Sequence, residues 1–138
     1  MSTTYGFGCQ LPLNVTEAIA ATTAALKQEG FGILTEIDVQ ATLKAKLDVE
    51  YRPYVILGAC NPQLAYRGLQ AEPELGLLLP CNVIVYDNGD GTSTVSIVDP
   101  LQMLSVANNP ALQPVANEAK ARLQRVIEHL DEPQSTQA

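Results

Sequence analysis

The sequence predicts an α+β fold in which helices pack largely on one face of an antiparallel sheet of about five strands. Five short runs rich in β-branched and aromatic residues are interspersed with amphipathic helical patterns. A turn-rich loop, residues 87–91, joins the last two of these runs and is typical of a hairpin. The chain has 138 residues, the length of one domain, and 46% of them are hydrophobic, enough for a single core.

The first predicted strand covers residues 5–11, and a helix follows it. Asn14 and Glu17 have the spacing of a capping box, which starts the helix, and Gly30 supplies the left-handed conformation that ends it. Residues 32–37 alternate well enough to predict a second strand.

A short second helix is predicted after Asp38, whose side chain can cap it. Its apolar face consists of residues four apart: Val39, Leu43 and Leu47. The third strand begins at Tyr54 and ends in Gly58-Ala59-Cys60. Asn61-Pro62 combines a capping residue with a proline at the first helical position, so a third helix is predicted directly after Cys60.

Residues 81–86 and 94–98 are the predicted hairpin strands, and Asn109-Pro110 predicts the start of a final helix that ends near residue 130. One face of this helix is apolar: Ala116, Ala119, Leu123, Val126 and Leu130. The polar end of the chain contains Pro133. We therefore expect one α+β domain at 1–130 and a flexible C-terminal tail at 131–138.

Composition excludes several classes of protein. The formal net charge is −7 and only 5% of residues are aromatic, which argues against a nucleic-acid partner. The first residues do not resemble a signal peptide, and the most apolar stretch, 75–85, is interrupted by Pro80 and is too short to cross a membrane. Three cysteines are too few for a secreted disulfide framework. We expect a cytoplasmic protein with reduced thiols and no membrane partner.

Missing motifs exclude more chemistry. His129 is the only histidine, and the chain has no phosphate-binding glycine loop, no Cys-x-x-Cys and no His-Glu metal motif. A hydrolase, kinase or nicotinamide enzyme is therefore not supported. A Cys-dependent enzyme with Cys60 as nucleophile and no identified base stays open.

The candidate site centres on Cys60 and Cys81. Cys60 lies just before a predicted helix start, where we expect a lowered thiol pKa. The strand–helix–strand unit can return Cys81 to its side, and Met103 is a conceivable third ligand for a soft metal such as Cu(I). The pair could serve as a redox dithiol, a carrier of sulfane sulfur or a metal site. Alternatively, both cysteines only pack as small hydrophobes.

A second hypothesis is an interaction or small-ligand module. Tyrosines and arginines gather around the third strand and the helix after it: Tyr51, Arg52, Tyr54, Tyr66 and Arg67. They could line an anion pocket beside Cys60, since arginine binds anions through two donors. Tyr54, Tyr66 and Arg67 could equally form a ligand pocket or a dimer face in which the thiols play no part.

Three stretches and two later positions together resemble a known prokaryotic family. The stretches are Gly30-Phe-Gly-Ile-Leu-Thr-Glu-Ile-Asp-Val-Gln-Ala-Thr-Leu-Lys44, Gly58-Ala-Cys-Asn-Pro62 and Ala71-Glu-Pro-Glu-Leu-Gly-Leu-Leu-Leu-Pro-Cys-Asn-Val83. With Asp99-Pro100 and Met103 they resemble domain of unknown function 302. The resemblance implies a small cytoplasmic α+β protein with a TBP-like arrangement of sheet and helices, often a homodimer. It implies no particular activity.

Overall fold

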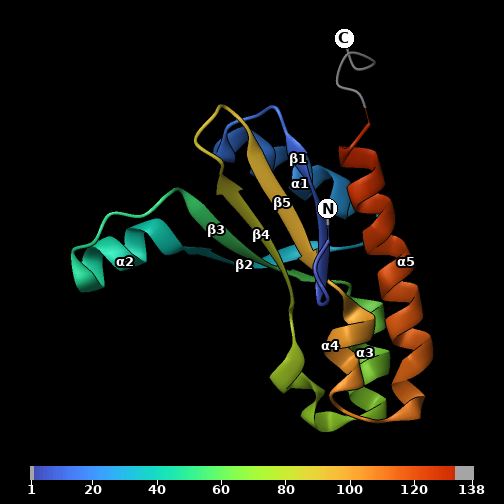
Figure 1. Ribbon diagram of the computed structural model, residues 1–138. Helices are drawn as coiled ribbons and strands as arrows, with labels where there is room; N and C mark the ends of the chain where they lie inside the picture. The colour runs from blue at the N-terminus through green and yellow to red at the C-terminus, as the bar shows by residue number, and fades with distance from the viewer. Residues whose placement is uncertain (1, 133–138) are drawn as a thin grey trace.

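The computed structural model describes residues 2–132 and confirms the α+β fold (Figure 1). One five-stranded sheet has the order β1-β5-β4-β3-β2, and every neighbouring pair of strands is antiparallel. The strands are β1 (Gly6–Leu11), β2 (Gly32–Asp38), β3 (Tyr54–Cys60), β4 (Cys81–Asp87) and β5 (Ser93–Val98). The predicted hairpin joins β4 to β5, and Gly89 and Gly91 take positive φ angles in its loop.

The first three helices begin where the capping signals predict. The helices are α1 (Val15–Gln28), α2 (Val39–Leu47), α3 (Pro62–Ala71), α4 (Pro100–Ser105) and α5 (Gln113–Leu130), with two 3₁₀ turns, η1 (Pro73–Leu78) and η2 (Pro110–Leu112). Asn14 and Glu17 form the complete capping box of α1. The side chains of Asp38 and Asn61 each accept a hydrogen bond from a backbone N–H in the first turn of the helix that follows.

The final helix begins three residues later than predicted. Residues 110–112 form η2, and the α-helix starts at Gln113. Pro114 explains the difference because it has no N–H to donate to the carbonyl of Pro110, so a regular helix cannot run through both residues. The predicted apolar face is otherwise confirmed, since Ala116, Ala119, Leu123, Val126 and Leu130 are all buried.

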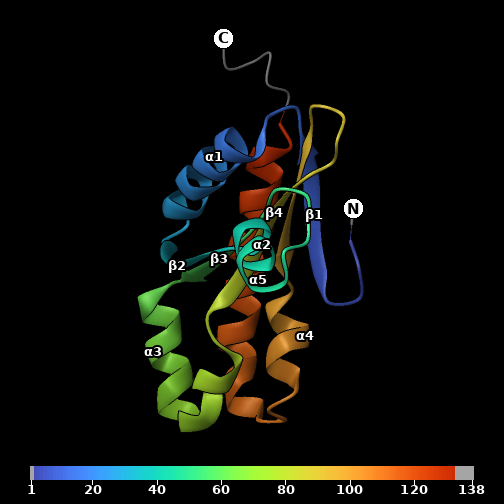
Figure 2. The same ribbon diagram turned by 90° about the vertical axis from the view of Figure 1, so that its left-hand side faces the viewer.

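Helices α1 and α5 cover the same face of the sheet (Figures 1 and 2). The main core lies between them and the strands and is almost entirely aliphatic, with fully buried members such as Leu26, Leu57, Val83, Val95 and Leu123. The opposite face of the sheet carries no helix in Figure 1, and we call it the open face. Helices are thus packed largely on one face, as predicted.

A second packing unit lies beyond the end of β3 and the start of β4. Here α3, η1 and α4 surround the first half of α5, and we call this unit the lower lobe (Figure 2). It has a small core of its own: Leu75, Leu104, Leu112 and Ala116. A Cβ on Gly68 would lie 2.5 Å from Cδ2 of Leu75, so glycine at this position lets η1 approach α3 closely.

Helix α2 projects away from the sheet (Figure 1), and none of its residues is buried. We call residues 39–51, between β2 and β3, the arm. The helix was predicted correctly, but the residues of its apolar face, Val39, Leu43 and Leu47, are not buried, because the helix lies beyond the core. Polar contacts hold the arm instead, including a hydrogen bond from Nε2 of Gln40 to the carbonyl of Tyr51.

Among residues 2–132, no helix is both long and apolar enough to cross a membrane. Residues 133–138, which make up most of the tail expected to be flexible, lie outside the described residues.

Candidate functional site

A pocket of about 300 Å³ lies where the sheet meets the lower lobe. The end of β3, the start of β4, α3, η1, α4 and the first half of α5 all contribute to its wall. Of the described residues that line it, none is an Asp, Glu, Lys, Arg or His, and Asn61 has the only side-chain amide. The sheet and the lower lobe have separate hydrophobic cores, and the pocket lies between these two cores.

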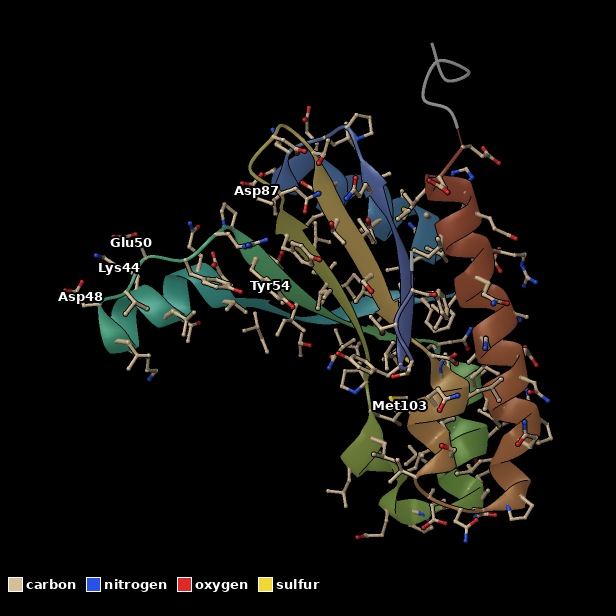
Figure 3. All side chains as sticks on the ribbon, in the orientation of Figure 1. Lys44, Asp48, Glu50, Tyr54, Asp87 and Met103 are labelled. Atoms are coloured by element: carbon tan, nitrogen blue, oxygen red, sulfur yellow. The ribbon has the colours of Figure 1, made fainter. Side chains whose placement is uncertain are left out.

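All three sulfur-bearing residues of the predicted site line this pocket. Cys60 ends β3 and Cys81 begins β4; Cys81 pairs with Ala59, and Cys60 lies one residue beyond that pair, so both cysteines belong to the same end of the two strands. Met103 reaches the pocket from α4, below the sheet in Figure 3. The chain folds in this way because α3 and η1 leave the sheet at Cys60 and return to it at Cys81.

The thiols differ from the expectation in one respect. A helix start was expected to lower the pKa of Cys60, but burial raises it above the ordinary value. Cys60 precedes the capping residue Asn61, whose side chain already accepts the Leu64 N–H. The start of the helix therefore has one fewer free N–H group that could stabilise a thiolate. Burial, together with the neighbouring Cys60, raises the pKa of Cys81 to about 11. Both thiols are therefore protonated at neutral pH.

The pocket reaches solvent on the side of β2 and α3. Two of its lining residues are exposed, Leu34 of β2 at 68% and Leu69 of α3 at 39%. Cys81 is buried, whereas Cys60 is only partly buried. A small molecule that enters past Leu34 and Leu69 would therefore meet an apolar wall and the more accessible of the two thiols.

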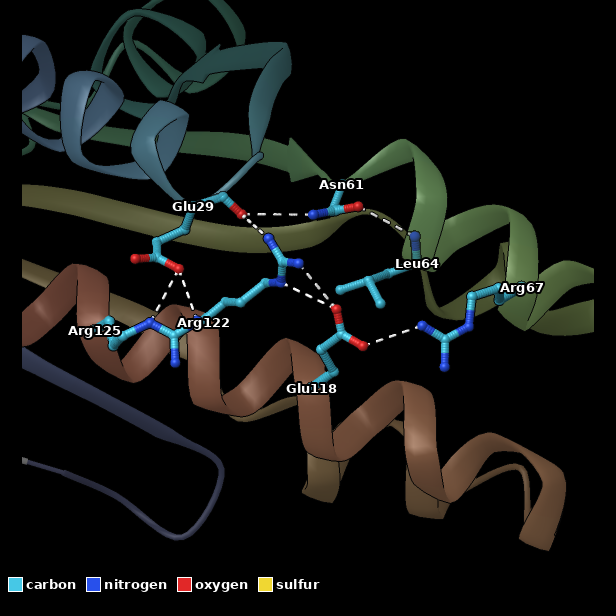
Figure 4. Close-up of polar contacts among 7 residues, drawn as sticks. All are labelled: Glu29, Asn61, Leu64, Arg67, Glu118, Arg122 and Arg125. Carbon is cyan, nitrogen blue, oxygen red and sulfur yellow. Dashed lines mark hydrogen bonds and ion pairs between the residues drawn. The ribbon is translucent and has the colours of Figure 1, made fainter.

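A polar network supports the wall from behind (Figure 4). Asn61 is 8% exposed; its Oδ1 accepts from the Leu64 N–H at 3.1 Å, and its Nδ2 donates to the carbonyl of Glu29 at 3.5 Å. Nη1 of Arg122 donates to the same carbonyl at 2.9 Å, and Arg122 also pairs with Glu118. Because both ends of the Asn61 amide are engaged, the network positions the start of α3 and presents no free charge to the pocket.

The other predicted residues are not brought to the pocket. Tyr54 lies on the open face of the sheet, well separated from Met103 in Figure 3. It precedes Cys60 by six residues along one strand, which corresponds to about 20 Å. Tyr66 is 66% exposed on α3, and Arg67 pairs with Glu118 at 3.1 Å. The structure therefore does not assemble Tyr54, Tyr66 and Arg67 beside Cys60.

Several wall residues were not predicted from the sequence. Leu75 and Leu79 come from the apolar stretch that begins at residue 75, whose length was compared only with that of a membrane span. Val115 and Ala119 of α5 line the pocket as well, but nothing in their spacing separates them from the other buried positions of that helix. The leucine-rich run was thus the one available signal.

The sulfur side chains of the pocket are ligands of the kind that soft metals prefer. Among residues 2–132, no group of three or more His, Cys, Asp or Glu side chains could hold a metal ion. The pocket offers two thiols and the thioether of Met103, and sulfur ligands of this kind favour Cu(I) over harder cations.

Comparisons with known proteins agree with this architecture. The family model described as Domain of unknown function DUF302 matches residues 7–130, from β1 to the end of α5. The chain is also similar to a solved structure, described as the crystal structure of an uncharacterized conserved DUF302 protein from Bacillus stearothermophilus. The sequences are 31% identical, the TM-score is 0.84, and the match covers 93% of this chain and 99% of the other. None of the curated proteins matches the chain.

Proposed function

The chain belongs to the DUF302 family, whose name assigns no activity, and from the pocket we propose that it binds one small apolar molecule. The observation that carries the proposal is the uncharged wall between the sheet and the lower lobe. Binding sites for small molecules are mainly apolar clefts with a few polar groups that orient the ligand. Here the groups that could orient it are the two neutral thiols.

The volume limits the size of the ligand. The pocket holds about 300 Å³, which is near the lower end of the range for small-molecule sites. Since one water molecule occupies about 30 Å³ in the liquid, the pocket has room for on the order of ten non-hydrogen atoms. A short alkyl chain or a single aromatic ring is the appropriate size.

The wall also selects against charge. A carboxylate in the pocket would lose its hydration and meet no cation in return, because Arg122, the cation of the supporting network, pairs with Glu118 outside the pocket. The Cys60 and Cys81 thiols stay neutral at pH 7 and add no charge of their own. We therefore expect a neutral ligand to bind more tightly than its carboxylate analogue.

Isothermal titration with 1-octanol and octanoate tests this proposal. We expect saturable binding of the alcohol with one site per chain, and affinity for the carboxylate at least tenfold weaker at pH 7. The absence of saturable binding by either probe, or tighter binding of octanoate, would contradict the proposal.

Ala65→Phe supplies the test of location. Ala65 is a lining residue on α3, and a phenyl ring there occupies the pocket, so affinity for 1-octanol is expected to fall at least tenfold. Ala41→Phe is the matched control, because Ala41 is exposed on α2 and does not line the pocket. Circular dichroism verifies that both variants fold.

A soft metal or a sulfane sulfur atom is the second candidate ligand, favoured by the three sulfur side chains in one wall. Coordination of Cu(I) by both thiolates releases two protons, so the raised pKa values of Cys60 and Cys81 predict an affinity that falls steeply as the pH is lowered. Anaerobic competition with a chromogenic Cu(I) chelator measures this affinity, and intact mass spectrometry detects a persulfide sulfur.

Two substitutions separate the metal proposal from adventitious binding. Cys60→Ser and Met103→Leu should each weaken Cu(I) binding, whereas Cys9→Ser should not, since Cys9 lies in the main core and does not line the pocket. Equal losses in all three variants would refute a site at the pocket.

We also propose that the chain forms a homodimer through the arm and β2. Leu47 and Val49 are 66% and 43% exposed, and β2 is an edge strand whose outer backbone groups are unpaired in the sheet order. Two copies related by a twofold axis can pair the same edge strand of each sheet, so a second copy of the chain is the partner that fits this edge.

Light scattering after size exclusion should give a dimer for the parent chain and a monomer for Leu47→Glu. Leu77→Glu, at an 82% exposed leucine outside the arm, is the control that should stay dimeric.

A further inference from the structure

We propose that the open face of the sheet carries a second ligand site, a groove that binds a small planar aromatic anion. The groove has a volume of about 630 Å³ and shares no lining residue with the apolar pocket. It lies between the N-terminal segment and the base of the arm, across β3, β4 and β5. The inference is independent of the proposed function, because it rests on different residues.

Stacked tyrosines form one side of the groove. Four of the five tyrosines of the chain line it: Tyr5, Tyr51, Tyr54 and Tyr86. Tyr54 and Tyr86 lie opposite each other in the β3–β4 ladder, with ring centroids 5.3 Å apart and planes 9° from parallel. Tyr51 adds a third ring, 6.1 Å from Tyr54. No helix covers this face in Figure 1, so the rings present a stacking platform to solvent.

Arg52 supplies the positive charge. Its guanidinium lies 5.6 Å from the centroid of the Tyr86 ring, and Nη1 donates to the backbone carbonyl of Asp87 at 3.4 Å. Within residues 2–132 it makes no ion pair, whereas the other arginines each pair with a carboxylate: Arg67, Arg122 and Arg125. Its charge is therefore available to a bound anion.

The rest of the lining agrees with an anionic ligand. The chain contains 15 Asp and Glu residues, yet no described carboxylate side chain lines the groove. Ile84 and Val98 provide apolar surface next to the rings, and Asn82 and Ser96 provide neutral hydrogen-bonding groups. An aromatic ring on the tyrosines can thus place a carboxylate or sulfonate near Arg52 without meeting a like charge.

A second copy of the chain fits the groove less well than a small aromatic molecule. The chain has no Trp and two Phe, and Tyr66 is the only tyrosine outside the groove. A second copy therefore has few aromatic rings that could stack in the groove of the first. Two of the exposed apolar residues of the arm, Leu47 and Val49, do not line the groove, whereas Tyr51 at the base of the arm does. A dimer that forms through Leu47, Val49 and β2 therefore leaves the remaining lining residues of the groove uncovered.

Titration calorimetry with 2-naphthoate and 2-naphthol tests the site on the full chain. We expect saturable binding of 2-naphthoate that weakens at least fivefold in Arg52→Gln, while binding of the neutral 2-naphthol changes less than twofold. Tyr86→Leu should weaken both probes, because it removes the ring that holds Tyr54 and Arg52 in place in the groove. Arg67→Gln is the matched control and should leave both affinities unchanged.

Two further measurements locate the site. Ala65→Phe fills the apolar pocket and should not change 2-naphthoate binding, and NMR of tyrosine rings should show shifts for the groove tyrosines but not for Tyr66. No saturable binding of 2-naphthoate, loss of binding in Ala65→Phe, or equal effects of Arg52→Gln and Arg67→Gln would each overturn the proposal. A parent chain that does not bind 2-naphthoate, and whose dimer dissociates on Tyr86→Leu, would show that a second copy covers the groove instead.

Discussion

The pKa values of Cys60 and Cys81 depend on the burial of each thiol more than on the helix that follows Cys60. A helix start stabilises a nearby anion by about 0.3–1 kcal/mol when its N–H groups are free. The Asn61 side chain already accepts one of these N–H groups, and the pocket wall offers no cation. Loss of hydration is then the larger effect, and both pKa values rise.

This burial predicts a loss of stability in alkaline solution. The pKa of Cys81 is about 11 in the folded chain against an ordinary 9.0, so between these values the unfolded chain releases a proton that the folded chain retains. The free energy of unfolding should therefore be unaffected by this thiol below pH 9 and decrease as the pH rises from 9 to 11. Urea denaturation at several pH values measures the decrease. Cys81→Ala should show a smaller decrease, and an unchanged pH dependence in that variant would contradict the assignment.

Thr22 predicts a stabilising substitution. It is fully buried in α1, and among the described residues its hydroxyl has no hydrogen-bond partner. Replacing a buried, unpaired hydroxyl by a methyl group removes a desolvation cost, so Thr22→Val should raise the free energy of unfolding by about 1 kcal/mol.

Thr22→Ser is the matched control because it keeps the hydroxyl and deletes a buried methyl group. It should lower the free energy of unfolding by about 1 kcal/mol. Chemical denaturation of both variants gives the comparison, and a destabilising Thr22→Val would show that the hydroxyl is satisfied in solution.

At the scale of elements, the junction of α1, α3 and α5 positions the pocket. The carbonyl of Glu29, just after α1, accepts from Asn61 at the start of α3 and from Arg122 in the middle of α5 (Figure 4). Three elements distant in sequence thus share one acceptor. Gly30 makes this possible, since a Cβ there would lie 2.9 Å from Nδ2 of Asn61 and 3.4 Å from Nη1 of Arg122.

Gly30→Ala should therefore cost more than a glycine substitution elsewhere with the same backbone conformation. Gly89 is the matched control, because its φ of +81° is close to the +83° of Gly30 and a Cβ at Gly89 would meet no atom within 4 Å. Backbone strain alone should make Gly89→Ala cost about 1 kcal/mol. Gly30→Ala should cost at least about twice as much in urea denaturation, and equal costs would mean that the junction adjusts freely.

At the scale of the whole molecule, side chains are buried unevenly. The sheet, α1 and α5 share the main core, and the lower lobe has a smaller core. The arm has no buried residue in α2, and isolated helices of this length are marginally stable in water. We therefore expect the arm to be the part of the described chain whose order would gain most from the proposed dimer.

Hydrogen exchange can measure this dependence. Amide protection in α2 should increase with protein concentration as the proposed dimer forms, whereas α5, whose apolar face lies in the core, should be strongly protected at every concentration. Leu47→Glu should abolish the concentration dependence in α2 and leave α5 unchanged. Protection in α2 that is independent of concentration in the parent chain would contradict dimerisation through the arm.

Local signals were sufficient to predict most of the fold. Asn14, Asp38 and Asn61 predicted where three helices begin, because a cap acts through hydrogen bonds to residues at most three positions away. The five strands and the hairpin followed from residue type and turn chemistry in the same way. That Cys60 and Cys81 line one pocket was also predictable, since the chain leaves the sheet and re-enters it within one strand–helix–strand unit.

Contacts between distant segments required the tertiary structure. Tyr54 and Tyr86 meet only through the register of β3 and β4, and Tyr54 points to the face opposite the main core rather than toward Cys60. The neutral state of the thiols and the exposure of the arm depend on which surfaces other elements cover. Spacing along the chain specifies periodicity and caps, but burial is a property of the packed molecule, and in this protein burial determines the chemistry of both candidate sites.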